Sequence, residues 1–256
     1  MRSINVTRYV TPLREGGSLP AIVEADDDGM YVLKFSGAGQ GKKALIAELI
    51  AGELARAFGL RVPDIVFANL DKELARTEPD QEIQDLLKAS AGLNLALDYL
   101  PGSITFDPVV DKIDPQTAAR IVWFDAFIMN VDRTPRNPNM LMWHKDLWLI
   151  DHGASLYFHH SWDDWESQAL KPFALIKDHV LLPFAQDIFA GEAEATEIFT
   201  PELFSNVVQN IPDAWLDDSA EISDEKRSVY IKFLTARMEN SGIFTAEAVD
   251  AAKKLV

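Results

Sequence analysis

The most constraining stretch of the sequence runs from Phe127 to Gly153 and reads FIMNVDRTPRNPNMLMWHKDLWLIDHG. An apolar run ends at Asp132, a turn rich in proline and asparagine follows, and two short apolar segments then lead to Asp151. A simple hairpin does not require carboxylates and carboxamides at the ends of its apolar segments. A carboxylate in such a place is costly unless it is paired or binds a metal. The stretch therefore predicts a polar site held between buried elements.

Asp132 and Asn137 stand in the spacing D-x-x-x-x-N, which the catalytic loops of protein kinases use. In such loops the aspartate accepts the proton of the acceptor hydroxyl, and the asparagine binds Mg²⁺ through its side-chain oxygen. Asn139 is a second candidate metal ligand, because it begins the following apolar segment. Asp151 begins a D-x-G motif and supplies a carboxylate, which Mg²⁺ prefers beside phosphate oxygens. Taken alone, the residues around Asp132 also fit an ordinary turn.

Lys34 lies within the apolar stretch YVLKF. A lysine there is costly unless its ammonium group meets an anion, so we expect it to reach the α- and β-phosphates of a nucleotide. The alternation of a strand also allows Lys34 to face solvent. Glu48 and Glu53 follow on the next predicted helix, and we expect Glu48 to orient the lysine.

Glycine-rich turns supply candidates for binding phosphate. Gly16, Gly17 and Ser18 lie between two predicted strands, where backbone N–H groups can approach a phosphate, although a plain glycine hairpin explains them equally well. The stretch GAGQGKKA at 37–44 does not have the spacing of a P-loop, and Lys43 occupies the position where Ser or Thr binds magnesium. We therefore do not interpret it as a P-loop.

The segment DYLPG ends a predicted strand and marks a boundary. We expect the backbone of Asp98, Tyr99 and Leu100 to contact adenine there, although a simple strand end also accounts for the segment. The boundary predicts an N-terminal lobe of residues 1–101 and a C-terminal lobe of residues 102–256. A ligand cleft between the two lobes is the expected arrangement.

Hydrophobic periodicity predicts a β-rich N-terminal part with one helix and a helical C-terminal part, which is an α+β fold with two lobes. Asp114 and Pro115 are a favoured N-cap and first residue for a central helix, whose apolar residues cover nearly every face. Residues 72–90 are polar and are expected to be helical or irregular. The predicted strands are 5–12, 21–25, 30–35, 61–71 and 92–102, and the predicted helices are 44–58, 114–130, 167–189, 201–209, 224–240 and 245–255.

Composition excludes several classes of protein. The chain has 256 residues, of which 48% are hydrophobic and 25% charged, as in ordinary globular proteins. It has no cysteine, which excludes disulfides, zinc–thiolate sites and cysteine nucleophiles. A formal net charge of −16 repels phosphate backbones and argues against direct nucleic-acid binding. No apolar run is long enough for a signal peptide or a membrane span, so we expect a cytoplasmic protein.

The segments LDYLPG, NVDRTPRNPNML and LWLIDHGASL, together with the region around Lys34, resemble the HipA-like kinases. These are a branch of the protein-kinase-like fold, related to the HipA toxins of bacteria and more distantly to phosphoinositide kinases. The similarity spans about residues 5–160. Thr134 departs from the pattern, because related catalytic loops usually have a histidine at that position.

The resemblance implies a bilobal kinase fold that uses ATP and Mg²⁺. It assigns Asp132 as the catalytic aspartate, Asn137 and Asp151 as magnesium ligands, and Lys34 as the ATP lysine. It also implies a role in a toxin–antitoxin pair, with a small DNA-binding antitoxin as a partner.

The leading hypothesis is a phosphotransferase that acts on a Ser or Thr hydroxyl of a protein, with Arg133 or Arg136 steadying the acceptor or the loop. The alternatives are a nucleotide-binding pseudokinase that serves as a partner module without transfer, and a small-molecule kinase. We expect His144, His159 and His160 to lie at the surface.

Overall fold

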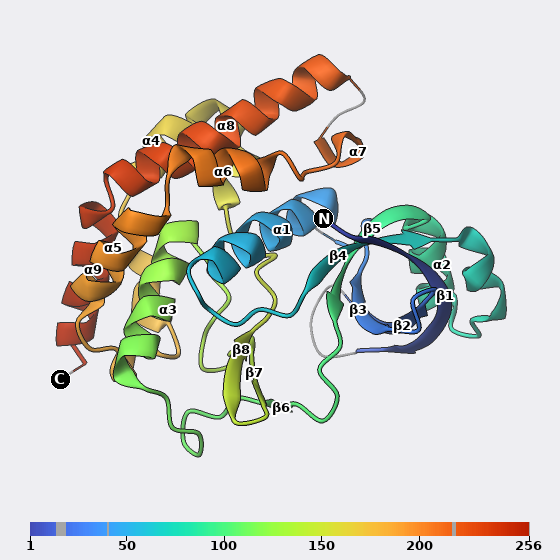
Figure 1. The fold of residues 1–256 in the computed structure, drawn as a ribbon, viewed down its shortest axis with the longest axis horizontal. Helices are drawn as coiled ribbons and strands as arrows, with labels where there is room; N and C mark the ends of the chain where they lie inside the picture. The colour runs from blue at the N-terminus through green and yellow to red at the C-terminus, as the bar shows by residue number, and fades with distance from the viewer. Residues whose placement is uncertain (14–18, 40, 217–218, 256) are drawn as a thin grey trace.

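The computed structural model describes residues 1–255 apart from 14–18, 40 and 217–218. A barrel of N-terminal strands lies at one end of the molecule and the C-terminal helices lie at the other, with α1 (Gly41–Ala57) between them (Figure 1). The barrel strands are β1 (Ser3–Pro12), β2 (Ala21–Ala25), β3 (Met30–Lys34), β4 (Ile65–Leu70) and β5 (Gly92–Asp98).

The barrel follows the order β1-β2-β3-β5-β4 and is closed by parallel pairing of β1 with β4. The first three strands form the antiparallel meander that the sequence predicted, whereas the closure was not predicted. Closure removes the exposed strand edges of an open sheet. Between β4 and β5 lie the 3₁₀ helix η1 (Lys72–Thr77) and α2 (Gln81–Ala89), in the stretch expected to be helical or irregular.

The central helix α3 (Pro115–Ile128) begins as predicted, with the Asp114 side chain accepting a hydrogen bond from the Thr117 N–H at 2.8 Å. It is buried on nearly every face and ends at Met129, which adopts the left-handed conformation. A small sheet of β6 (Ile104–Thr105), β7 (Met140–Trp143) and β8 (Asp146–Leu149) follows the barrel. The loop between α3 and β7 therefore starts from a rigid helix end and returns to a paired strand.

The C-terminal part differs from the sequence prediction in several elements, since the helices over 188–198 and 213–216 were not predicted. A single helix over 167–189 is wrong, because Pro172 and Pro183 each lack the N–H that a continuous helix needs. The predictions for the helices near 201, 224 and 245 are confirmed to within a few residues. The elements are η2 (Tyr157–His160), η3 (Trp162–Asp164), α4 (Trp165–Ala169), η4 (Ala174–Asp178), η5 (Leu182–Phe184), α5 (Ile188–Ile198), α6 (Pro201–Val208), α7 (Asp213–Leu216), α8 (Ala220–Glu239) and α9 (Gly242–Lys253).

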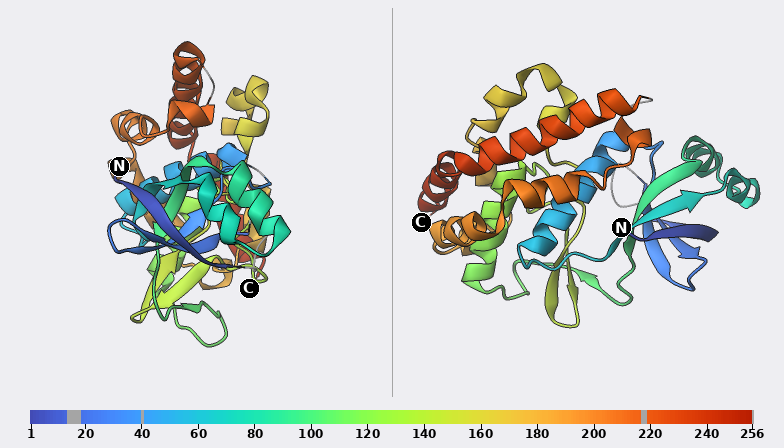
Figure 2. Two further views of the ribbon diagram at one scale, coloured as in Figure 1. Left: turned by 90° about the vertical axis from the view of Figure 1, so that its right-hand side faces the viewer. Right: turned by 45° about the horizontal axis from the view of Figure 1, so that its top comes forward.

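Two apolar cores hold these elements. One fills the barrel, and the other joins α1 to α3 and the C-terminal helices. The right-hand view in Figure 2 also places α1 between the barrel and the helices. No described helix combines the length and the apolar character needed to span a membrane. The lobe boundary at residue 101 stays a prediction, and α1 packs with elements on the far side of it.

Candidate active site

Lys34 is the centre of an ionic cluster built from three separate segments. Its Nζ atom lies 2.6 Å from Oε2 of Glu48 on α1 and 2.5 Å from Oδ1 of Asp151, which follows β8. The Lys34 side chain is 13% exposed and that of Glu48 is fully buried. The lysine therefore points into the molecule, and Glu48 rather than Glu53 contacts it.

The charges of this cluster depend on one another. Burial alone would lower the pKa of Lys34, but Asp151 and Glu48 outweigh that effect and raise it above its usual range. Burial alone would raise the pKa of Glu48, but the Lys34 ammonium and hydrogen bonding from His152 lower it to about 2. Both groups are therefore ionised at neutral pH. Lys34 must be charged in this way if it is to bind a phosphate.

His152 connects α1 to the D-x-G motif. Its backbone N–H donates to Glu48 Oε2 at 2.9 Å, and its Nδ1 atom lies 3.4 Å from Oε1 of the same carboxylate. The ring is fully buried and packs edge-on against Phe124 of α3. Glu48 thus holds the lysine with one oxygen and the segment after Asp151 with both, so the three segments are fixed together.

Asn139 and Asp151 are brought together by the β7–β8 hairpin. Met140 pairs with Leu149, and the Ile150 N–H donates to the Asn139 carbonyl at 3.0 Å. Both Asn139 and Asp151 adopt left-handed backbone conformations, with φ of 47° and 56°, which Asn and Asp tolerate better than most residues. The Asp151 side chain is 42% exposed, so its carboxylate remains open to a ligand.

Asp132 is held by two carboxamides. Its Oδ2 atom accepts hydrogen bonds from Nδ2 of Asn137 at 2.9 Å and from Nδ2 of Asn139 at 3.5 Å. When an amide nitrogen faces a carboxylate, its oxygen is left to accept another donor or to bind a cation. Thr134 and Asn137 exchange backbone hydrogen bonds at 3.0 Å, which forms the tight turn that returns Asn137 to Asp132. Both asparagines therefore stay candidates for the metal ligand.

The donor set suits a hard cation. Among the described residues no group of three His, Cys, Asp or Glu side chains is arranged to hold a metal. A metal at this site would depend on the carboxylate of Asp151, amide oxygens of Asn137 or Asn139, and oxygens from a ligand. Magnesium is commonly held in this way, by one or two carboxylates together with substrate phosphates.

The predicted adenine contacts are partly occupied within the chain. The Asp98 N–H donates to the Asp64 carbonyl at 2.8 Å, and the Tyr99 N–H donates to the Met30 carbonyl at 3.0 Å. These two amides are therefore engaged within the chain, and the prediction that Asp98 and Tyr99 contact adenine would depend on their other backbone atoms. The Leu100 amide remains a candidate donor. Gly16, Gly17 and Ser18 lie outside the described residues.

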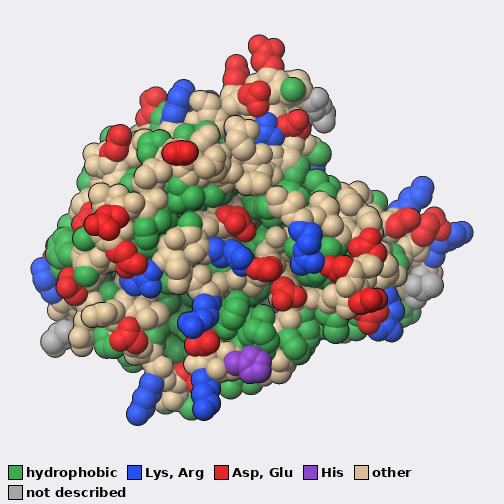
Figure 3. Space-filling model, in the orientation of Figure 1, with side chains coloured by type: hydrophobic (Ala, Val, Ile, Leu, Met, Phe, Trp, Pro, Cys, Tyr) green, Lys and Arg blue, Asp and Glu red, His purple; other side chains and the backbone are tan. Residues whose placement is uncertain are grey.

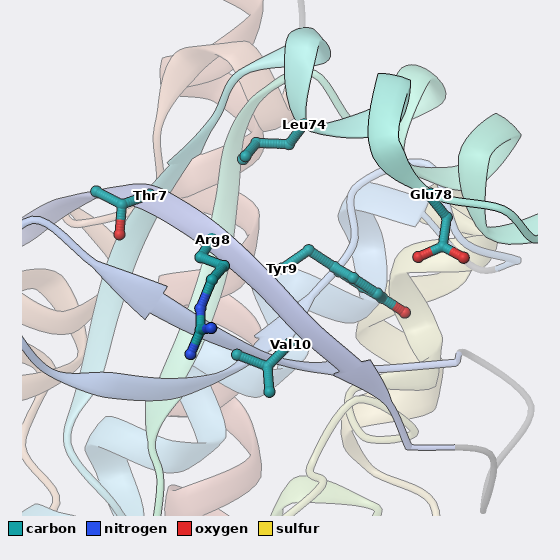
Figure 4. Close-up of a pocket in the computed structure, with 6 residues that line it drawn as sticks. All are labelled: Thr7, Arg8, Tyr9, Val10, Leu74 and Glu78. Carbon is teal, nitrogen blue, oxygen red and sulfur yellow. The ribbon is translucent and has the colours of Figure 1, made fainter.

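Two surface cavities lie away from the ionic cluster. One of about 300 Å³ lies between β1 and η1 and is drawn in Figure 4. The other, of about 450 Å³, is lined in part by Asp98, Leu100, Trp143 and Trp148. Figure 3 shows acidic side chains spread over both the barrel and the helical part, interspersed with basic ones. Neither cavity is lined by Lys34 or by the carboxylates of the candidate site.

The sequence reasoning named Arg133 but missed its partner Asp125. Asp125 and Arg133 form a fully buried ion pair, with Arg133 Nε 2.5 Å from Asp125 Oδ2. A charged residue in the otherwise apolar helix α3 was the available signal, because such a residue needs a partner. Arg133 therefore steadies the loop, which was one of its two expected roles. His144 and His160 are exposed as expected, but the surface prediction for His159 is wrong, because it is fully buried against Tyr230.

Comparison with solved structures identifies the fold. A proinflammatory kinase of Helicobacter pylori, CtkA, aligns over 99% of this chain and 98% of its own, with a TM-score of 0.56 and 12% identity. A Golgi casein kinase with Mn/ADP bound aligns over 94% of this chain and 73% of its own, with a TM-score of 0.50 and 12% identity. A search of curated proteins finds no match.

The barrel, the central helix and the helical part thus form a kinase fold, and the ionic cluster lies where its parts meet. The family described as HipA-like kinase matches residues 6–242. The chain belongs to the HipA-like kinase family. The fold prediction and the resemblance noted from the sequence are confirmed.

Proposed function

We propose that the protein is an ATP- and Mg²⁺-dependent phosphotransferase whose acceptor is a Ser or Thr hydroxyl of a protein. The observation that carries the proposal is the placement of Lys34 between Glu48 and Asp151, at 2.6 and 2.5 Å. A buried cation held by two carboxylates from distant segments, one of them still accessible, is the arrangement that kinases use to bind phosphates beside a metal.

Each residue of the site has a role in this proposal. Lys34 neutralises phosphate oxygens, and Glu48 orients it. Asp151 holds magnesium, with Asn137 or Asn139 as a further ligand. The bound nucleotide supplies the phosphoryl group to be transferred. Because phosphoryl transfer asks little covalent chemistry of the protein, positioning and charge stabilisation provide most of the rate.

Asp132 is the proposed acceptor of the proton. The acceptor hydroxyl oxygen forms a bond to the γ-phosphorus, the bond from that phosphorus to the leaving ADP oxygen breaks, and the hydroxyl proton passes to the Asp132 carboxylate. The hydrogen bonds from Asn137 and Asn139 fix the carboxylate for this step. A protein acceptor follows from the family resemblance, whereas the hydroxyl chemistry follows from the aspartate.

The proposal is tested by separating binding from transfer. We expect Mg·ATP to raise the melting temperature of the wild type, because a ligand that binds only the folded form stabilises it. Asp151→Asn should abolish the magnesium-dependent part of this shift. Asp132→Ala should keep the shift but lower phosphate transfer by roughly 10²- to 10⁴-fold.

Three results would count against the proposal. Binding of Mg·ATP by the wild type with no more transfer than by Asp132→Ala would indicate a pseudokinase. Transfer to free small molecules, and not to any protein including the chain itself, would indicate a small-molecule kinase. If Mg·ATP does not change the melting temperature of the wild type, the protein does not bind the nucleotide and the proposed site is wrong.

A further inference from the structure

The loop between α3 and β7, which carries Asp132, is anchored by one buried carboxylate. That carboxylate accepts hydrogen bonds from three side chains. Asp125, in the last turns of α3, is fully buried, and its Oδ2 atom accepts from Arg133 Nε at 2.5 Å and from His179 Nε2 at 2.8 Å. Its Oδ1 atom accepts from Asn130 Nδ2 at 3.1 Å. Because the site is withdrawn from water, any donor that is lost cannot be replaced by solvent.

The hydrogen bonds of His179 define its protonation. The Leu181 N–H donates to His179 Nδ1 at 3.0 Å, so Nδ1 carries no proton. The Nε2 atom must then carry the proton and donate it to Asp125. A neutral ring is also what burial favours, since burial lowers the pKa of His179. His179 therefore acts as a fixed donor on one side and a fixed acceptor on the other.

The partners of Asp125 reach the backbone on both sides of the candidate catalytic residues. Arg133 Nη1 donates to the Asn139 carbonyl, and the Asn130 side-chain oxygen accepts from the Asp132 N–H at 3.2 Å. The Val180 N–H donates to the Arg133 carbonyl at 3.1 Å, which joins the segment containing His179 to the same loop. The loop and this later segment are thus closed into one hydrogen-bonded unit.

We propose that His179 is a positioning residue for phosphate transfer. It acts through Asp125 and Arg133, which set the backbone of Asn139, while Asn130 sets that of Asp132. Without the Nε2 donor, the Asp125 carboxylate is left to Arg133 and Asn130, and Arg133 is drawn away from the Asn139 carbonyl. This inference rests on the proposed function and adds to it a residue outside the motifs that the resemblance identifies.

Three substitutions of His179 separate its two hydrogen bonds. His179→Gln carries an amide nitrogen at about the reach of Nε2 and can keep the contact with Asp125. His179→Asn carries an amide oxygen at about the reach of Nδ1 and can keep only the contact with Leu181. His179→Phe fills the volume and makes neither contact, so it measures packing alone.

Three measurements are made on each full-length variant. These are the turnover of ATP, measured as release of γ-phosphate, the Kd for Mg·ADP, and the side-chain amide NMR signals of Asn137 and Asn139. We expect His179→Asn and His179→Phe to lower kcat by about 10- to 100-fold while the Kd for Mg·ADP changes by less than about twofold. The asparagine signals should move in the same two variants. His179→Gln should restore kcat to within roughly threefold of the wild type.

The comparison of His179→Gln with His179→Asn decides the inference even if His179→Phe does not fold. Equal kcat values in those two variants, or a folded His179→Phe with wild-type kcat, would overturn it. A purely structural role would lower the melting temperature of all three variants without separating kcat from the Kd for Mg·ADP. If the wild type itself neither binds Mg·ADP nor turns over ATP, the proposed function fails first and the inference falls with it.

Discussion

Lys34 and Glu48 stabilise each other because both side chains are withdrawn from water. Replacing Lys34 with methionine leaves the Glu48 carboxylate buried without its cation, and we expect the free energy of unfolding at pH 7 to fall by about 3 to 5 kcal/mol. Denaturant titration of the variant measures the loss. Lys88→Met is a matched control, because Lys88 is on the surface, and it should change the value by less than about 0.5 kcal/mol.

The same pair predicts how this loss depends on pH. In the wild type the pKa of Glu48 is lowered to about 2, so its contribution is present above the unfolded pKa and is lost as the pH falls towards 2. In Lys34→Met only burial and His152 remain, so the pKa of Glu48 rises and protonation favours the folded state. The difference between wild type and variant should therefore shrink on acidification. A constant difference from pH 7 to pH 3 would contradict this explanation.

His159 predicts a separate pH effect. Burial lowers its pKa to about 3, and its Nδ1 atom lies 2.9 Å from the Tyr230 hydroxyl. The unfolded chain binds this proton first as the pH falls, so the stabilisation is complete above about pH 6.5 and is lost between there and pH 3. Relative to His159→Gln, the wild type should lose up to about 1.4 kcal/mol per pH unit in that window. Parallel pH curves from denaturant titrations would show that His159 does not titrate in this way.

At the scale of elements, Arg237 of α8 holds the end of α3. It is fully buried and donates to the carbonyls of Ala126 and Phe127, both at 2.6 Å, and to those of Ala169 and Lys171 at 3.1 and 3.0 Å. Burial lowers its pKa to about 9, which leaves the guanidinium charged at neutral pH. A cation at the C-terminal end of α3 is favoured by the helix dipole.

Replacing Arg237 therefore tests how much α8 stabilises the end of α3. Arg237→Met leaves several carbonyls without donors, and we expect it to lower the free energy of unfolding by about 3 kcal/mol or more. Arg237→Lys keeps the charge but has fewer donors, so it should cost less. Thermal and denaturant unfolding measure both. A lysine variant as unstable as the methionine variant would show that geometry, and not charge, is what α3 requires.

The elements also show which features could be predicted from the sequence and which could not. The sequence singled out Lys34 because it lies within an apolar stretch, and Asp151 because it follows one, and the structure brings these two side chains into contact. Asp132 was singled out by its spacing to Asn137, and their side chains share a hydrogen bond. His179, one of the three side-chain partners of Asp125, was not identified from the sequence, because it lies in the stretch that was predicted to be one continuous helix. The closure of the barrel by β4 depends on contacts between segments distant in the sequence, which local patterns do not record.

At the scale of the whole molecule, α1 is enclosed on two sides. It packs against the barrel strands β4 and β5 and against α6 and α7 of the C-terminal part. Trp215 of α7 extends this contact, since its indole N–H donates to the Leu93 carbonyl at 3.2 Å and its ring meets Phe67 edge-on at 5.6 Å. Figure 1 shows α7 beside α1 and β5. The helix that carries Glu48 is thus held by both the N-terminal barrel and the C-terminal helices.

Removing the contact between Trp215 and the barrel should make the Lys34–Glu48–Asp151 cluster less rigid without changing any residue of that cluster. Trp215→Ala deletes a buried indole, and we expect the free energy of unfolding to fall by about 3 to 5 kcal/mol. Hydrogen exchange should rise in α1 as well as in α7, and Mg·ADP should bind more weakly, because Glu48 is less firmly placed. Trp215→Phe keeps an aromatic ring beside Phe67 but loses the hydrogen bond and part of the buried ring, so it should cost less than Trp215→Ala, at about 1 to 3 kcal/mol.

Phe189→Ala is the control for Trp215→Ala, because that side chain is 52% exposed and its loss should leave exchange in α1 unchanged. If exchange in Trp215→Ala rises only in α7, then α1 is fixed by the barrel and α3 alone. If it rises throughout α1 and spreads to the segment around His152, the C-terminal helices are part of what keeps Lys34, Glu48 and Asp151 in contact. The enclosed position of α1 favours the second result, since Glu48 reaches His152 directly.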